Sequence, residues 1–279
     1  MPQELKNIIQ SFKYDGQDPE IDIKLKNARV SKKPSVKRNS SPKKTIKQVV
    51  TDTTDLPDLR QSLGSNLTVL FIGFNPGVQS SIQQHHYAHH SNLFWKLFNQ
   101  SKLLEKTVAG KKKDGVINNE TDNNDHLRSL LDNGCSAKDD FDLIHYDIGF
   151  TDLALRCTAT AAELTTEEKL HNIPRLLQEI NSSHPENVVL IGKGIWEVFV
   201  KYYISELGMK FKLNKDNFQW GKLKLGADKQ YNRIIEQLLA QIPPETSVYV
   251  FPSTSGLVAS MSFQEKLNLW QSLANNIQH

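Results

Sequence analysis

From residue 67 onward, short apolar runs alternate with longer segments whose apolar positions recur at helical spacing. Continuous apolar runs are typical of strands buried on both faces. The pattern predicts strands at residues 67–74, 147–152, 187–192 and 247–251. It predicts helices at residues 92–104, 166–182, 195–205, 229–241 and 263–277, the second with a kink or late start at Pro174. Strands alternating with helices indicate α/β architecture: a single three-layer α/β/α domain with a mostly parallel central sheet, which we expect over residues 63–279.

Residues 105–140 interrupt this alternation. They contain three consecutive lysines from Lys111 and two Asn-Asn pairs, with little apolar content before Leu127. Such a stretch cannot supply much core, so we expect a mobile surface insertion.

A stiff loop follows the first predicted strand. It reads Gly73-Phe74-Asn75-Pro76-Gly77, and its proline and glycines favour a tight turn. Asn75 is its one polar side chain. Open α/β sheets bind ligands at the carboxyl ends of their strands, so Asn75 is a candidate functional residue.

Further blocks complete a recognisable set. The segment from His85 ends in Asn92-Leu93-Phe94-Trp95, and later blocks read Ile148-Gly149-Phe150-Thr151-Asp152, Leu190-Ile191-Gly192-Lys193 and Pro252-Ser253-Thr254-Ser255-Gly256-Leu257. Together with the Asn75 loop, these blocks resemble the uracil-DNA glycosylase superfamily, in particular its mismatch-specific uracil/thymine-DNA glycosylase branch. The resemblance runs from about residue 67 to the end of the chain.

The resemblance implies a reaction and a catalytic residue. It implies hydrolytic removal of uracil or thymine mispaired with guanine, or of bulky cytosine adducts such as ethenocytosine, from double-stranded DNA after base flipping. Asn75 would position the attacking water, because a neutral amide orients water but cannot take its proton. The loop has no carboxylate, so turnover should be slow. No cofactor is expected.

The resemblance also implies a base pocket and a DNA-binding loop. Tyr87 would stack on the flipped base; the alternative is a rim aromatic packed on the following helix. The pocket would be lined by Gly73, Phe74, Pro76, Gly77, His86, Tyr87 and Thr151. DNA contacts would come from Lys193, Ser253, Thr254, Ser255 and Gly256. Leu257 would act as a wedge in the vacated stack, or else be a buried helix-entry residue.

Four histidines, His85, His86, His89 and His90, form pairs at i and i+4. On a helix such pairs could bind zinc. Gly77 and the Gln/Ser run favour a loop instead, and no Cys or carboxylate lies nearby in sequence. We therefore predict no metal site and a histidine loop that faces DNA.

The amino-terminal 62 residues differ in composition from the rest. Residues 1–60 hold 13 basic and 8 acidic residues, and the stretch 29–47 holds eight basic residues and no acidic one. Such a polar segment does not bury enough surface to fold alone, so residues 1–62 are predicted to be a disordered basic tail. The tail would hold DNA, direct nuclear import, or serve as a plain linker.

The cysteine count and the length of the apolar runs indicate the cell compartment that we expect. Two cysteines indicate a reducing environment, and no apolar run approaches membrane-spanning length. We expect a nuclear monomer that acts on DNA and hands its product to an abasic-site endonuclease, with no membrane association.

Two other classes of function remain open. The first is a catalytically weak or inactive DNA-binding module of the same fold, which would have no chemical need for Asn75. The second is a Rossmann-like small-molecule-binding protein, although the chain lacks the G-x-G-x-x-G and P-loop patterns.

Overall fold

The computed structural model describes residues 53, 55–113, 125–256 and 261–277, without the side chains of 111–113. The strands in this part of the chain form one five-stranded sheet in the order β2-β1-β3-β5-β4. Their bounds are β1 Val69–Gly73, β2 Ile148–Asp152, β3 Asn187–Ile191, β4 Gly221–Lys222 and β5 Ser247–Phe251. All neighbours pair in parallel except β4, which runs antiparallel to β5. The predicted strands are confirmed, and β4 was missed because two residues carry no periodic signal.

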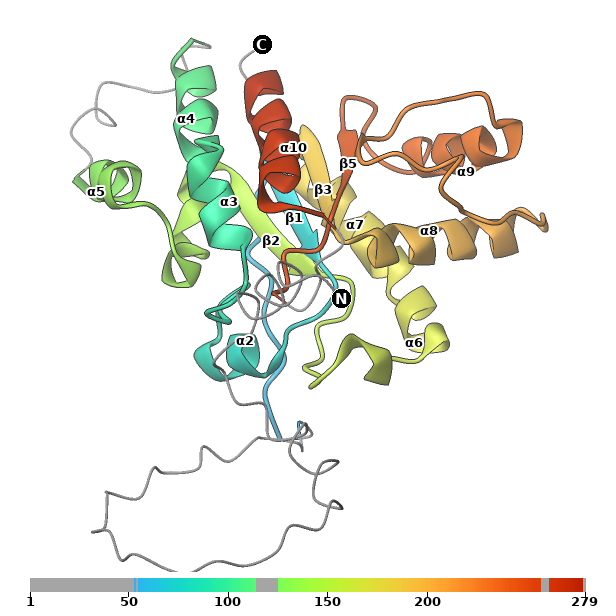
Figure 1. Cartoon of the computed structure of the whole chain (residues 1–279), viewed down its shortest axis with the longest axis horizontal. Coiled ribbons are helices and arrows are strands. Elements are labelled where there is room, and N and C mark those ends of the chain that lie inside the picture. The colour runs from blue at the N-terminus through green and yellow to red at the C-terminus, as the bar shows by residue number, and fades with distance from the viewer. Residues whose placement is uncertain (1–52, 54, 114–124, 257–260, 278–279) are drawn as a thin grey trace, which may run out of the picture. The chain divides into compact units, whose positions relative to one another are not determined.

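Helices cover both faces of the sheet (Figure 1). On one side are α3 Phe94–Gln100, α4 Leu103–Lys113, α5 Asp125–Asn133 and α10 Phe263–Asn276. On the other are α7 Ile173–Ser183, α8 Lys193–Glu206 and α9 Lys229–Leu239, while α2 Val78–Gln83 and α6 Thr166–His171 lie in the connections that follow β1 and β2. This is the predicted three-layer arrangement.

The strand β1 explains why both layers are needed. Its side chains alternate between the two cores: Val69 and Phe71 enter the first, and Leu70 and Ile72 the second. Phe71 packs edge-on against Phe94 and stacks on Phe150, at centroid distances of 5.0 and 5.7 Å. A strand buried on both faces requires helices on both sides.

Helix boundaries follow local chemistry. The predicted helix at 166–182 is divided at Asn172, and Pro174 lies in the first turn of α7, where a missing N–H costs nothing. The predicted helix at 92–104 is also divided, because Lys102 adopts a left-handed backbone conformation with φ of 59°.

The range predicted to be an insertion contributes to the core at both ends. Val108 of α4 and Leu127 and Leu130 of α5 are buried in the first core cluster, and Asp140 is fully buried. The expectation that residues 105–140 lie at the surface is therefore wrong for these positions. Residues 114–124 lie outside the described residues.

The predicted disordered tail, residues 1–62, includes residues at its carboxyl end that pack on the domain. Leu59 is buried, and Ser62 forms an antiparallel bridge with Phe150 through two backbone hydrogen bonds of 2.8 Å. This segment covers the edge strand β2, which would otherwise leave unpaired N–H and C=O groups. Residues 1–52 lie outside the described residues, and no helix among the described ones is long and apolar enough to cross a membrane.

Candidate active site

The loops at the carboxyl ends of β1 and β5 meet. The Leu93 N–H donates to the Thr254 carbonyl over 2.8 Å. A Cβ added to Gly256 would lie 2.7 Å from Ser91 Oγ and 2.8 Å from Ser91 O, so only glycine permits this approach. Segments more than 150 residues apart in sequence thus form one surface at this edge of the sheet.

The segment after β2 shapes the Asn75 loop. Backbone N–H groups of Leu153, Ala154 and Thr158 donate to the carbonyls of Gly73, Phe74 and Pro76, over 2.8, 3.1 and 3.2 Å. Because three carbonyls of the loop accept backbone hydrogen bonds, the loop cannot adopt another conformation without losing them. Thr158 was not predicted as a site residue, since its partner lies far away in sequence.

The Asn75 amide is oriented by its partners. Its Nδ2 donates to Thr158 Oγ1 at 2.7 Å and to the Arg156 and Pro76 carbonyls at 3.2 Å. Two of these partners are carbonyl oxygens, which can only accept, and they identify the atom that contacts them as the amide nitrogen and the other as the oxygen. No partner of Oδ1 is found within the described residues, so this oxygen is left to accept a hydrogen bond from a water.

Tyr87 stands beside this loop. Its backbone is left-handed, with φ of 54°, and its ring stacks on Phe94 at 3.9 Å and 3°. The rim packing weighed as an alternative is therefore observed for one face of the ring. The hydroxyl is buried and lacks a hydrogen-bond partner within the described residues. Burial, followed by the nearby Asp152, raises the pKa of the Tyr87 hydroxyl, which stays a neutral donor.

Asp152 lies beside Gly73 and the Tyr87 hydroxyl. It pairs in register with Gly73, and a Cβ on Gly73 would lie 2.0 Å from Asp152 Oδ1 and 3.0 Å from Tyr87 Oη. Both polar groups therefore converge on the glycine, and no larger residue fits there. Burial raises the pKa of the Asp152 carboxyl to about 6, although His86 and Arg175 act to lower it and Glu179 adds to it.

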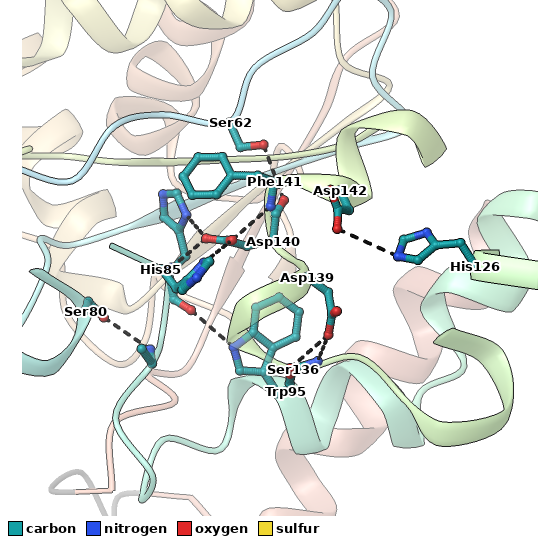
Figure 2. A network of polar contacts seen from close by, with 12 residues as sticks. Ser62, Ser80, His85, Trp95, His126, Ser136, Asp139, Asp140, Phe141 and Asp142 are labelled. Atoms are coloured by element: carbon teal, nitrogen blue, oxygen red, sulfur yellow. Dashed lines mark hydrogen bonds and ion pairs between the residues drawn. The ribbon is translucent and has the colours of Figure 1, made fainter. Parts of the chain in front are cut away.

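A buried carboxylate holds the histidine segment (Figure 2). Asp140 Oδ1 lies 2.8 Å from His85 Nδ1, and its Oδ2 lies 2.7 Å from both the backbone N and Nδ1 of His86. The Trp95 indole N–H donates to the His86 carbonyl over 3.2 Å. These contacts fix the backbone immediately before Tyr87. No carboxylate lies near the histidines in sequence. The tertiary structure supplies one, Asp140, which is 54 residues from His86.

The histidine pairs are not arranged for a metal. They follow α2 in a turn rather than on a helix, and His85 and His86 both direct Nδ1 at Asp140. No group of three or more potential ligands occurs within the described ranges.

The loop after β5 carries the predicted DNA contacts. The Lys266 ammonium donates to the Ser253 carbonyl over 2.9 Å, and the Ser255 N–H donates to Ser253 Oγ over 3.3 Å. Thr254 is buried, and Leu257 lies outside the described residues. Lys193, at the start of α8, pairs with Glu197 at 3.1 Å and lies over the Phe218 ring.

Two hollows lie elsewhere. One of about 640 Å³ lies between α6, α7 and α8, and one of about 240 Å³ borders Phe74, Lys169 and Gly194. Neither contains Asn75 or Tyr87, so the candidate site is assigned from the converging polar groups rather than from cavity size.

Comparison with known proteins identifies the family of the chain. Residues 61–274, which are more than half of the chain, match the uracil DNA glycosylase superfamily. The chain belongs to this superfamily. A G/U mismatch-specific uracil DNA glycosylase from Schizosaccharomyces pombe is 28% identical over 257 residues, covering 91% of this chain and 64% of that protein. The chain thus spans less than two thirds of the relative's length.

Two residues predicted for the base pocket lie on the opposite face of the sheet from the point where Gly73, Tyr87 and Asp152 meet. Thr151 points to the second core, where its hydroxyl donates to Glu179 Oε2 over 2.8 Å, and Phe74 packs on the same side against Gly194. Alternation along a strand is the reason: Gly73 and Asp152 share one face, and the residues next to them share the other. The structure therefore does not bring Thr151 and Phe74 together with the polar groups of Tyr87 and Asp152.

Proposed function

We propose that this chain is a monofunctional DNA glycosylase that hydrolytically removes uracil or thymine mispaired with guanine from double-stranded DNA. Membership of the superfamily and the name of the S. pombe relative support the reaction class. The observation that carries the proposal is the orientation of Asn75, whose nitrogen is anchored and whose oxygen is left for a water.

The chemistry follows from that orientation. Asn75 Oδ1 accepts one O–H of a water and directs an oxygen lone pair at C1′ of the flipped deoxyribose. The bond from C1′ to the base breaks, and the base leaves as an anion that takes up a proton from solvent. The water oxygen bonds to C1′ and releases one proton to solvent, so the overall reaction is hydrolysis. The amide does not take the water proton, so departure of the base leads and the rate is modest.

The base would lie against Gly73, between the Asn75 loop and Tyr87. The Tyr87 hydroxyl is a buried donor suited to a base oxygen, and the Asp152 carboxyl can accept from the uracil N3–H or, when protonated, donate to a carbonyl. Pro76 and Gly77 complete the wall by fixing the loop. His86 supports the wall rather than reading the base, because Asp140 engages its Nδ1.

The proposed substrates include thymine and ethenocytosine as well as uracil. Uracil and thymine share the N3–H and both carbonyl oxygens and differ by a methyl group. An extra methyl changes binding by only about 1–3 kcal/mol, so discrimination between these bases should be limited. Bulkier adducts would test whether the pocket is open on the side away from Gly73.

DNA would be held by the loop after β5. Ser253, Ser255 and Gly256 are small enough to approach a phosphate, with Lys193 at the neighbouring strand end. Leu257 would enter the space left by the flipped base, where an apolar side chain offsets part of the unstacking cost.

We also propose nuclear residence and a handover partner. The basic stretch 29–47 suits an import signal, and an abasic product calls for an abasic-site endonuclease. Fluorescent fusions with and without residues 1–52 test the first point: equal nuclear signal would contradict it.

One experiment tests the activity. The protein is incubated in excess with duplexes containing U·G, T·G, U·A or ethenocytosine·G, and abasic sites are then cleaved with alkali. We expect release from U·G to be fastest, slower release from T·G and ethenocytosine·G, and the least from U·A. Strand scission without alkali would contradict a monofunctional reaction.

The same assay separates the alternatives. Duplex binding without base release from any substrate would identify a DNA-binding module instead. Absence of both binding and release would leave the small-molecule alternative and overturn the proposal.

A further inference from the structure

Arg175 of α7 binds the carboxyl end of β2. Its Nη2 donates to the Asp152 carbonyl over 2.6 Å and to the Leu153 carbonyl over 2.9 Å. One planar guanidinium therefore holds two successive carbonyls at the point where the strand ends. A lysine could not replace it in full, because an ammonium group lacks the rigid fork of donors.

A buried carboxylate fixes the direction of the Arg175 side chain. Glu179 lies one helical turn further along α7 and accepts from Arg175 Nη1. The same carboxylate accepts from the Thr151 hydroxyl over 2.8 Å and from Gln61 Nε2 over 3.0 Å. These contacts leave the guanidinium few other orientations.

Stability alone does not explain this ion pair. Taking two charges out of water costs about as much free energy as their attraction returns, so neutral side chains can often replace a buried pair without loss of stability. The pair of Arg175 and Glu179 is better explained by the backbone positions that it fixes.

The two carbonyls belong to residues that shape the candidate site. The Asp152 side chain lies on the opposite face of the sheet, beside Gly73 and the Tyr87 hydroxyl. The Leu153 N–H donates to the Gly73 carbonyl over 2.8 Å, and the chain then continues to the groups that accept from the Asn75 amide. A shift of the backbone at 152–153 would therefore move the Asp152 carboxyl and the Asn75 anchor together.

We propose that Arg175 is a positioning residue for base release, which acts through the backbone of residues 152–153 and holds the Asp152 carboxyl and the Asn75 anchor in place. The inference rests on the proposed function. Arg175 acts from the face where Thr151 and Glu179 meet, so it does not touch the base itself. A displacement of about 1 Å at a reacting group can lower a rate about a hundredfold, so base release can fall steeply while the fold is kept.

The test compares base release with DNA binding and stability in the full chain. Single-turnover release of uracil from a U·G duplex is measured at increasing protein concentration, which separates the maximal rate from the half-saturating concentration. The melting temperature is measured in parallel. Arg175→Met should lower the maximal rate by about tenfold to a hundredfold and change the half-saturating concentration by less than about threefold.

Two further single variants frame this result. Arg175→Lys keeps the charge and loses the fork of donors, so it should recover only part of the rate. Arg128→Met is the matched control, because Arg128 forms an exposed helical ion pair with Asp125 on α5. This control should change neither the rate nor the half-saturating concentration.

A double variant separates positioning from packing and from charge. Arg175→Met alone leaves Glu179 buried without its cation, which can destabilise the fold. Adding Glu179→Gln removes the second charge and leaves an amide oxygen to accept from Thr151. It also removes both effects of the pair on the pKa of Asp152, which Arg175 lowers and Glu179 raises. Positioning predicts that the double variant is as slow as Arg175→Met while its melting temperature is close to that of wild type.

Several outcomes would overturn the proposal. Recovery of the wild-type rate in the double variant would assign the pair to packing or charge, and a wild-type rate in Arg175→Lys would exclude the fork. An unchanged maximal rate with weaker binding would place Arg175 in DNA affinity instead. Wild-type protein that releases no base refutes the glycosylase activity and this inference with it, whereas fast release by wild type and variants alike refutes this inference alone.

Discussion

At the scale of single residues, the site depends on which atom of a side chain is anchored. The Asn75 amide is oriented because its nitrogen donates to Thr158, Arg156 and Pro76, and Asp152 is unusual because burial raises the pKa of its carboxyl to about 6. Both effects come from the folded arrangement around the end of β2, which approaches the Asn75 loop only when the sheet has formed.

Asn75→Ala should abolish most base release while leaving DNA binding intact. The variant removes the oxygen that is proposed to orient water, and it leaves unchanged the loop after β5 that is proposed to contact DNA. Removing one positioned catalytic group typically costs about 10²–10³ in rate. Single-turnover excision of uracil from a U·G duplex, with affinity measured in parallel, checks this. A rate within a few-fold of wild type would exclude the assigned role.

Asp152→Asn should stabilise the protein at neutral pH but not in acid. The pKa of Asp152 is raised from 3.8 to about 6, so its stabilising contribution is complete below pH 3.8 and is lost as pH rises through 6. Above about pH 7 the ionised, buried carboxyl costs at most about 3 kcal/mol, which the amide avoids. Urea unfolding at about pH 7.5, 6 and 4.5 should show a gain that shrinks with falling pH. A gain of equal size at each pH would contradict the linkage.

At the scale of elements, the segment between α2 and α3 has little regular structure and relies on Asp140 for its shape. The carboxylate accepts from His85, from both the ring and the backbone of His86, and from the Phe141 N–H at 2.9 Å. Because Tyr87 follows directly, the ring over the proposed pocket is positioned by a residue in the connection before β2.

Asp140→Asn should therefore destabilise the fold and impair excision together. An amide cannot accept at both of its atoms, so at least one of these charge-assisted bonds is lost, at a cost of about 1.5–3 kcal/mol. Asp142→Asn is a close control: its exposed carboxylate lies 3.7 Å from the His126 ring, and a surface pair contributes about 0–1 kcal/mol. Chemical denaturation of both variants measures the difference, and equal effects would rule out a special role for Asp140.

At the scale of the whole molecule, charge is divided unevenly along the chain. Residues 1–60 carry 13 basic and 8 acidic residues, and the chain as a whole has a formal net charge of +3. The excess of positive charge therefore belongs to the amino-terminal segment, since residues 61–279 hold the remaining 21 basic and 23 acidic residues.

Removing residues 1–52 should leave a folded, active domain that binds DNA less tightly. Leu59 and Ser62 are kept because they pack against the segment after β2 and on β2 itself. The salt slope should flatten by about 0.9 for every phosphate that the segment no longer neutralises. Affinity for undamaged duplex across a salt series provides the measurement, and replacing the basic residues of 29–47 with glutamine in the full chain is the control. A slope identical to that of the full chain would exclude DNA binding by this segment.

The sequence by itself determined the strands, most helices and the order of the motifs, because these depend on local periodicity and turn chemistry. The run Val69–Ile72 and the rigid Gly73–Gly77 loop could be recognised without any partner. Strand alternation alone also predicts that the side chains of Thr151 and Asp152 lie on opposite faces of the sheet.

Only the tertiary structure decided which polar groups meet. Asp140 reaches the histidines, Thr158 orients Asn75, and Lys266 lies under the 253–256 loop across separations of 13 to 83 residues. Nothing in the local sequence of these residues distinguishes them from surface polar groups. Their burial and partners depend on how the connections cross the carboxyl edge of the sheet, and that is set by the packing of the two helical layers.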